Sequence, residues 1–368
     1  MGSESIFVGA ERLSLRKMGE NGVRVNFRRC GTIVAPDSHR KLTLTPFSPF
    51  SPFFPPFFRE PVLRIFSHPS CLAHDPGAGH PECPERLIAV AEALRAGLPH
   101  LLWQEAPQAL RSQLARVHDA QFIALILDHP GPAPRRLDPD TVMNAHSADA
   151  ALRACGACVN AVDSILAGYI ERAFCAVRPP GHHASANIAM GFCLFNSVAV
   201  AAAHALEAHG LSRVAIVDFD VHHGNGTQAI FENEERVMYL SSHQANVYPG
   251  TGHISERGVG NLVNAPLPTG CDGARFRATW RERLLPALAQ FRPQLLLISA
   301  GFDAHRLDPL ADLNLEADDF AWLSSELVAI ARRSGKGRIV SSLEGGYSLA
   351  ALRECVVAHV GALAASPA

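Results

Sequence analysis

Side chains that can bind a metal ion follow two apolar runs of this sequence. Asp220-Val221-His222 comes directly after the run 214–219, and Asp303 follows the run 295–299. In an extended segment, residues two apart point to the same side, so Asp220 and His222 can converge on one ion. Oxygen and nitrogen ligands of this kind suit Zn²⁺, and also Fe²⁺ or Co²⁺, and three protein ligands leave positions open for water and substrate. Each feature alone has a simpler explanation, because an Asp-x-His pair occurs on solvated turns and Asp303 could cap a helix.

Groups that can move protons follow two further apolar runs. The tandem His182-His183 comes after the run 174–177, and Tyr347 lies in a glycine-rich turn after the run 339–343. Imidazoles titrate near neutral pH and suit general acid and base roles, while a tyrosine hydroxyl can stabilise an oxyanion. A single histidine beside a proline turn is more often packed or solvated. Because all these groups follow apolar runs that resemble buried strands, they favour a catalytic metal site.

The elements that would hold these side chains form a regular pattern from residue 64 onward. Strands are predicted at 174–177, 214–219, 237–241, 295–299 and 339–343, and helices at 85–96, 148–166, 197–208, 276–291 and 317–333. Apolar strands separated by helices indicate an α/β fold, a single domain with a parallel β-sheet flanked by helices. Ligands of such sheets bind outside the carboxyl ends of the strands, where the polar clusters lie.

The first sixty residues differ from the rest of the chain. Residues 46–58 alternate prolines with phenylalanines, which excludes a helix or a central strand there. An arginine-containing, acid-poor start is typical of organelle targeting, but Glu4, Glu11 and Glu20 disfavour that reading. We predict that residues 1–60 are a disordered, targeting or spurious extension and that residues 61–368 form one catalytic domain.

Composition restricts the partners and the compartment. The chain has 368 residues and a formal net charge of −2, so no global basic field would hold nucleic acid or an anionic membrane. It contains no run of about eighteen apolar residues that predicts a membrane span. Nine irregularly spaced cysteines indicate reduced thiols. We predict a cytoplasmic protein with no direct nucleic-acid partner and no membrane contact, which could form a homo-oligomer.

Long motifs give the chain from residue 64 to 361 a resemblance to a known family. They are HPECPERL at 80–87, RPPGHHA at 178–184, GFCLFN at 191–196, and the segments 218–228, 299–305 and 343–347. With these motifs the sequence resembles the histone deacetylase superfamily, and their wording is similar to the class II branch and to bacterial histone deacetylase-like amidohydrolases. The resemblance implies an arginase–deacetylase type of fold and zinc-dependent deacetylase activity in the domain 61–368.

The resemblance also implies a role for each matching residue. Zinc would be held by Asp220, His222 and Asp303. His183 would be the general base for the attacking water and later the acid for the leaving amine. His182 would be its electrostatic partner, with Asp218 behind it, and Tyr347 would hydrogen-bond the acyl oxygen.

Other positions match the substrate and cation sites of the family. Phe192 and Tyr248 would line a narrow tunnel for an acyl-lysine stem, with the Gly191 carbonyl near the scissile N–H and Arg86 lining an inner cavity. A potassium ion would be bound at a site matched by Asp218, Asp220, His222, Ser241 and Ser242. Two positions depart from class I members: Asn225 replaces the aspartate behind the second histidine, and Tyr248 stands where phenylalanine is commoner.

The substrate expectation depends on Leu310. Relatives that select polyamines carry an acidic residue seven positions after the third zinc ligand, and Leu310 offers no charge there. We therefore expect acyl-lysine in a protein or peptide, with acetylpolyamines or other small acylated amines as the alternative. A non-catalytic scaffold is disfavoured because every ligand position, both histidines and Tyr347 are present. An arginase-like enzyme is disfavoured because it would need more bridging aspartates.

Overall fold

The computed structural model describes residues 5–8, 11–14, 62–128 and 133–365. Contacts divide the chain into two units, Met1–Phe58 and Arg59–Ala368. In the first unit, β1 (Ser5–Val8) pairs with β2 (Glu11–Ser14) in antiparallel register. The proline-rich part of the predicted extension, residues 46–58, lies outside the described residues, so the domain boundary stays a prediction.

The second unit is built on one eight-stranded sheet in which every pairing is parallel. Its strands, in spatial order, are β10 (Leu262–Leu267), β9 (Val237–Gln244), β8 (Val214–Asp218), β11 (Leu295–Ala300), β12 (Ile339–Leu343), β7 (Arg172–Cys175), β3 (Leu63–Ser67) and β4 (Leu102–Glu105). The central strands β8, β11 and β12 are buried along their whole length. Because both faces of a parallel sheet are covered by helices, such strands must be apolar on both sides.

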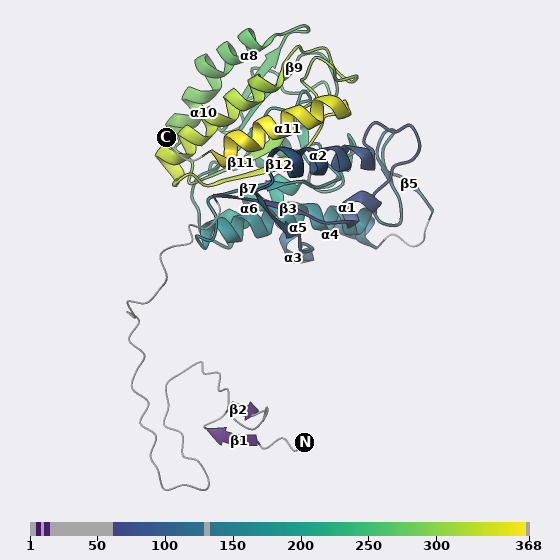
Figure 1. The fold of residues 1–368 in the computed structure, drawn as a ribbon, viewed down its shortest axis with the longest axis vertical. Coiled ribbons are helices and arrows are strands. Elements are labelled where there is room, and N and C mark those ends of the chain that lie inside the picture. Colours follow the sequence, from purple (N-terminus) through teal and green to yellow (C-terminus); the bar gives the residue numbers. More distant parts are fainter. Residues whose placement is uncertain (1–4, 9–10, 15–61, 129–132, 366–368) are drawn as a thin grey trace. The chain divides into compact units, whose positions relative to one another are not determined.

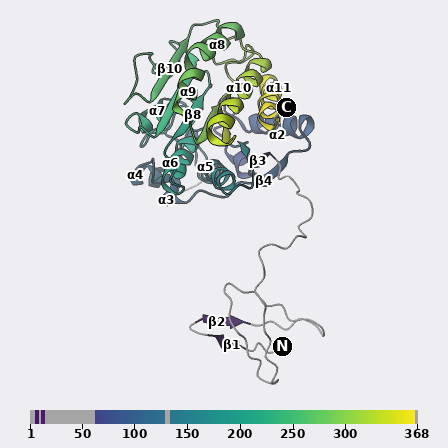
Figure 2. The ribbon, with the colours of Figure 1, turned by 90° about the vertical axis from the view of Figure 1, so that its left-hand side faces the viewer.

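Helices cover both faces of this sheet (Figures 1 and 2). One layer contains α2 (Pro84–Gly97), α10 (Ala317–Gly335) and α11 (Leu349–Ala364), and the other contains α5 (Ser147–Leu166) and α6 (Ser197–Glu207). Shorter elements complete the unit: α1 (Ser70–Ala73), α3 (Arg111–Leu114), α4 (Ala120–Leu127), α7 (Asn225–Phe231), α8 (Gly273–Thr279), the π-helical turn η1 (Trp280–Leu284), α9 (Leu285–Phe291) and the two-stranded ribbon β5 (Arg135–Arg136) and β6 (Val142–Met143). The prediction of a parallel sheet between helices is confirmed.

The predicted strands correspond to the middle of the sheet, β9, β8, β11, β12 and β7, although β7 begins two residues earlier than expected. The strands that were not predicted, β10, β3 and β4, lie at its two sides. Edge strands are partly solvated and therefore carry polar residues, as in the LWQE sequence of β4. The predicted helix 276–291 is three successive elements, because η1 separates α8 from α9.

A large apolar core fills the space between the sheet and its helices. It includes Phe66, Phe174, Phe219, Trp280 and Phe320, each at most 1% exposed. The eight cysteines among the described residues are free, and seven of them are buried. None of the described helices is long and apolar enough to span a bilayer.

Candidate active site

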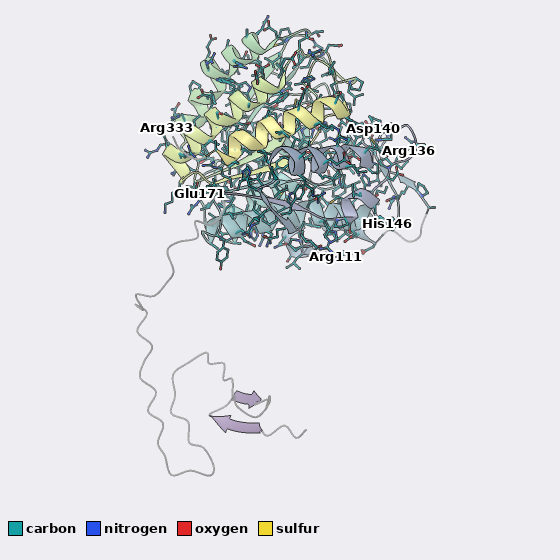
Figure 3. All side chains as sticks on the ribbon, viewed as in Figure 1. Arg111, Arg136, Asp140, His146, Glu171 and Arg333 are labelled. Atoms are coloured by element: carbon teal, nitrogen blue, oxygen red, sulfur yellow. The ribbon has the colours of Figure 1, made fainter. Side chains whose placement is uncertain are left out.

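The predicted site residues gather at the carboxyl ends of four adjacent strands. The order β8-β11-β12-β7 brings together the loops that carry Asp220, Asp303, Tyr347 and His183. In Figure 3, Glu171, directly before β7, and Asp140, in the connection between β5 and β6, lie on opposite sides of the unit. The site is on the Asp140 side, since the amide of Phe192 donates to the Thr141 hydroxyl of this connection.

Asp220, His222 and Asp303 form a buried cluster whose ligand atoms all lie within 4.8 Å of one another. His222 Nδ1 is 3.2 Å from Asp220 Oδ1 and 3.2 Å from Asp303 Oδ2. The remaining carboxylate oxygens are held by the backbone: Asp220 Oδ2 accepts from the Gly345 amide, and Asp303 Oδ1 accepts from the Val221 amide. One imidazole nitrogen and two carboxylates therefore face one point, with their outer atoms already oriented.

Two glycines make this convergence possible. A Cβ atom at Gly301 would lie 2.0 Å from Asp220 Oδ2, and one at Gly345 would lie 2.1 Å from Asp303 Oδ2. Any side chain at either position would displace a carboxylate. The glycines that follow β11 and β12 therefore serve close approach of the backbone to the site.

The electrostatics of the cluster favour a bound cation. Within the described ranges, the ion pairs of Asp220 and Asp303 are to histidines alone. Burial, and then the charge of Asp220, raise the pKa of Asp303 to about 7. A divalent cation would supply the missing positive charge, and this donor set and burial suit Zn²⁺ or a similar ion.

Two other groups of histidines and carboxylates, Asp163-His204-His209 and His305-Glu316-Glu354, suit a metal ion less well. Arg116 lies 2.8 Å from His204 Nδ1, and a guanidinium can only donate, so the proton of this histidine is on Nε2, facing Asp163. The Leu307 amide donates to His305 Nδ1, which leaves the Nε2 proton facing Glu316 and Glu354. To bind a metal ion through Nε2, either histidine would have to move its proton to Nδ1, which faces an N–H donor in both groups.

The two adjacent histidines beside the cluster have different partners. His182 Nδ1 is 3.1 Å from Asp218 Oδ2, and its Nε2 is 3.8 Å from Asp220 Oδ2. His183 Nδ1 is 2.8 Å from Asn225 Oδ1. An amide oxygen only accepts, so His183 carries its proton on Nδ1 and presents an unprotonated Nε2 when neutral. Asp218 and Asn225 therefore lie behind His182 and His183, as the family resemblance implied.

These partners separate the protonation states of the two histidines. Burial lowers the pKa of His182, but the charges of Asp220 and Asp218 outweigh it and raise this pKa to about 10. Burial, together with the charges of His182 and His222, holds the pKa of His183 well below its usual value. A cation bound at the cluster would lower the pKa of His183 further. A neutral His183 at pH 7 is therefore the state that the surroundings favour.

Three aromatic side chains, Tyr347, Phe192 and Tyr248, contact one another or the other residues of the site. The ring of Tyr347 lies over the Arg86 guanidinium at 4.8 Å and meets Phe192 edge-on at 5.7 Å between centroids. Tyr248 meets His183 edge-on at 5.1 Å and is 38% exposed. Arg86 itself is fully buried. The structure thus brings Tyr347, Arg86, Phe192 and Tyr248 to the same end of the sheet.

The remaining predicted residues have other surroundings. Gly191, with a φ of 55°, packs so closely that a Cβ would lie 2.4 Å from the His183 ring. Leu310 is partly exposed, and its amide donates to Asp308. The Ser241 hydroxyl pairs with His243, while the Ser242 hydroxyl accepts from Trp280.

Sequence reasoning assigned no role to Glu344, although it follows β12 directly. Its buried carboxylate accepts from the amides of Gly181 and His182 and from the Ser299 hydroxyl. Burial raises the pKa of Glu344 to about 7. An acidic residue directly after an apolar strand is the sequence signal that would have found it.

A second buried carboxylate, Glu82, was also missed. It binds Arg178 through two nitrogens, at 2.5 and 2.6 Å, and Arg86 at 3.0 Å. Its position inside the HPECPERL motif was visible, but its partners are 4 and 96 residues away. The more distant pairing could not be predicted from spacing.

Comparison with known proteins identifies the family of this chain. The histone deacetylase domain matches residues 80–363. Histone deacetylase 14, chloroplastic, of Arabidopsis thaliana is 35% identical over 330 residues, covering 81% of this chain and 76% of that protein. Polyamine deacetylase HDAC10 of Homo sapiens is 36% identical over 314 residues, covering 78% of this chain and 46% of that protein.

A solved structure extends the similarity to three dimensions. The crystal structure of the HDA15 HD domain has a TM-score of 0.78 and 34% identity, covering 83% of this chain and 88% of that one. The predicted arginase–deacetylase type of fold is thereby confirmed. On the sequence match, the shared fold and the set of buried polar groups, this chain belongs to the histone deacetylase family of deacetylase enzymes.

Proposed function

We propose that this deacetylase hydrolyses the acyl amide of N-ε-acyl-lysine in proteins or peptides, with Zn²⁺ held by Asp220, His222 and Asp303. The observation that carries the proposal is the buried triad, whose ligand atoms lie within 4.8 Å of one another beside His183. The turn that carries Tyr347 contacts the triad through the Gly345 amide, which donates to Asp220. Asp220, His222 and Asp303 would hold a divalent cation, which when bound would supply polarisation of the amide carbonyl and a more acidic water.

The residues around the triad can perform the remaining steps. A neutral His183, fixed by Asn225, takes a proton from the attacking water and returns it to the leaving nitrogen, which avoids expulsion of an amide anion. His182, held by Asp218, is the electrostatic partner of His183, whose ring lies 4.0 Å away between centroids. The Tyr347 hydroxyl donates to the acyl oxygen as negative charge develops on it.

The surroundings of the triad suit a slender, uncharged stem. Phe192 and Tyr248 provide aromatic walls, as an acyl-lysine methylene chain requires, and the Gly191 carbonyl would accept from the scissile N–H. A potassium ion near Asp218, Asp220, His222, Ser241 and Ser242 remains part of the proposal. It would depend on backbone carbonyls, because the side-chain oxygens of Asp218, Ser241 and Ser242 already have protein partners.

The oxyanion role is tested with Tyr347→Phe in the metal-loaded enzyme. Loss of one oxyanion donor should lower kcat on an ε-acetyllysine peptide by about 10²–10³-fold. The metal content should stay unchanged, because Tyr347 is outside the triad. Tyr169→Phe is the matched control, since Tyr169 is 62% exposed on the surface, and it should turn over normally. Equal rates for Tyr347→Phe and the control would sink the proposed role.

The substrate is tested by direct competition. Leu310 offers no carboxylate to a polyamine nitrogen, so we expect a higher kcat/KM for ε-acetyllysine peptides than for acetylputrescine or acetylspermidine. The relative named as a polyamine deacetylase keeps the second substrate class in the comparison. A preference for the polyamines would overturn the acyl-lysine assignment while leaving the hydrolytic chemistry in place.

A further inference from the structure

Two buried, oppositely charged side chains hold the peptide group between Gly346 and Tyr347. Arg86 Nε donates to the Gly346 carbonyl at 2.6 Å. Asp308 Oδ2 accepts from the Tyr347 amide at 2.7 Å. The carbonyl and the amide are the two polar ends of a single peptide group, so Arg86 and Asp308 grip it from both ends.

The contacts of Asp308 go beyond this one bond. Its Oδ2 also accepts from the Ser348 amide at 3.2 Å, and its Oδ1 accepts from the Leu310 amide at 3.1 Å. The side chain is 7% exposed, so these three amides replace the water that a carboxylate would otherwise bind. Hydrogen bonds to an ionised group of this kind are roughly twice as strong as neutral ones.

The flexible backbone before Tyr347 explains why these two hydrogen bonds are needed. Gly345 and Gly346 precede the tyrosine, and Gly346 has a φ of 115°, a conformation that costs a glycine little to enter or leave. Within the described part of the chain, the Tyr347 ring lies against Arg86 and Phe192, and neither of these ring contacts is a hydrogen bond to its hydroxyl. Without the hydrogen bonds from Arg86 and to Asp308, this turn would allow the Tyr347 hydroxyl to move relative to the triad.

We infer that Asp308 is a positioning residue, which with Arg86 clamps the Gly346–Tyr347 peptide and so sets where the Tyr347 hydroxyl points. Asp308 lies five residues after Asp303 in the loop that follows β11. One loop therefore supplies a triad carboxylate and also fixes the distance from it to the tyrosine. This inference rests on the proposed oxyanion role of Tyr347.

A double-mutant cycle tests the inference in the full-length, metal-loaded enzyme. Asp308→Ala, Tyr347→Phe and the double variant are compared with the unmodified enzyme for kcat and KM on an ε-acetyllysine peptide. Misplacement of a reacting group by about 1 Å can cost on the order of 10²-fold in rate. We therefore expect Asp308→Ala alone to lower kcat by about 10–10²-fold with little change in KM.

The decisive result is the coupling between the two sites. If Asp308 acts through the tyrosine hydroxyl, Asp308→Ala should lower kcat by less than about threefold once Tyr347 is phenylalanine, because the effects of coupled residues do not add. The same loss in both backgrounds would overturn the clamp while leaving the proposed function intact. Tyr347→Phe at the wild-type rate would overturn both.

Two further variants separate positioning from stability. Asp308→Asn keeps the side-chain volume and one acceptor oxygen, so it should fold if Asp308→Ala does not and should give a smaller loss with the same coupling. Asp319→Ala is the matched control, because Asp319 is also buried and also accepts from a backbone amide, that of Glu316. Its charged partner is Arg277 of α8, and not a residue of the Tyr347 turn. Asp319→Ala should lower the melting temperature without the coupling to Tyr347→Phe.

Discussion

At the scale of single residues, the site depends on two glycines, Gly301 and Gly345, as much as on its three metal-binding side chains. Asp220 and Asp303 can approach one another only because positions 301 and 345 lack a Cβ. The alternative reading of Asp303 as a helix cap does not describe its contacts, because its carboxylate faces His222 and the Val221 amide. The geometry of the triad therefore requires glycine at positions 301 and 345.

Gly345→Ala should therefore damage metal binding before anything else. Its Cβ would lie 2.1 Å from Asp303 Oδ2 and 2.5 Å from Asp220 Oδ2, so at least one carboxylate must turn away. We expect zinc affinity, measured by competition with a chelator, to fall by about 10–100-fold, as for other changes that misorient a ligand. Gly361→Ala is the control, since its nearest atom is 4.0 Å away. Unchanged affinity in Gly345→Ala would argue against a metal ion at the triad.

At the scale of elements, Glu82 ties the start of α2 to the loop after β7. It binds Arg178 from that loop and Arg86 from the helix, and both arginines are fully buried. Burial by itself would raise the pKa of Glu82. The charge of Arg178, with contributions from His74 and Arg86, outweighs burial and keeps this pKa well below its usual value of 4.5. The loop that carries His182 and His183 is thus anchored by an ion pair outside the metal centre.

Glu82→Gln should lower the free energy of unfolding at pH 7, and below about pH 4.5 it should make that free energy depend less on pH. Because the folded pKa is depressed, the contribution of Glu82 is fully present above about pH 4.5 and is lost as the pH falls below it. At pH 7 the variant leaves two buried arginines without their carboxylate, which costs about 3–5 kcal/mol in the free energy of unfolding. Urea unfolding at several pH values measures both effects.

The control for that experiment is Glu92→Gln. Glu92 pairs with Arg353, and both side chains are about half exposed. Such pairs contribute about 0–1 kcal/mol, so this variant should follow the wild-type pH profile. A Glu82→Gln curve that parallels wild type below pH 4.5 would contradict the depressed pKa.

At the scale of the whole molecule, the second compact unit contains every residue of the proposed mechanism. It runs from Arg59 to Ala368, and the family match lies within it. A chain that begins at Arg59 should therefore keep the melting temperature and the turnover of the full-length protein. A chain that begins at residue 70 lacks β3, which pairs with both β4 and β7 and buries Leu63, Ile65 and Phe66, and it should not fold.

Circular dichroism melting and the peptide assay measure both truncations. A large loss of stability on removing residues 1–58 would contradict the predicted boundary near residue 60. The cytoplasmic location and a homo-oligomeric state also stay predictions at this scale. Native mass spectrometry would report the mature N-terminus and the number of subunits together.

The sequence by itself determined the fold class, the central strands and the chemical groups of the site. Apolar β-branched runs such as those of β8 and β11 are local signals, and the polar residues at their ends identify the edge of the sheet where ligands bind. The edge strands β4 and β10 were not predicted because a solvated edge dilutes that apolar pattern, and β3 was not predicted because Arg64 interrupts its short apolar run. A family motif could name His182, Asp218 and Tyr347, since it preserves their identity along the chain.

Only the tertiary structure decided how these groups are supported. Glu344 reaches Gly181 across 163 positions, Glu82 reaches Arg178 across 96, and Asp308 reaches Tyr347 across 39. Such pairings follow from the order of strands in the sheet, which local propensity does not encode. The protonation states of His182 and His183 likewise depend on burial and on charges brought from other strands. Residue types were legible in the sequence, but their distances and environments arise when the sheet is assembled.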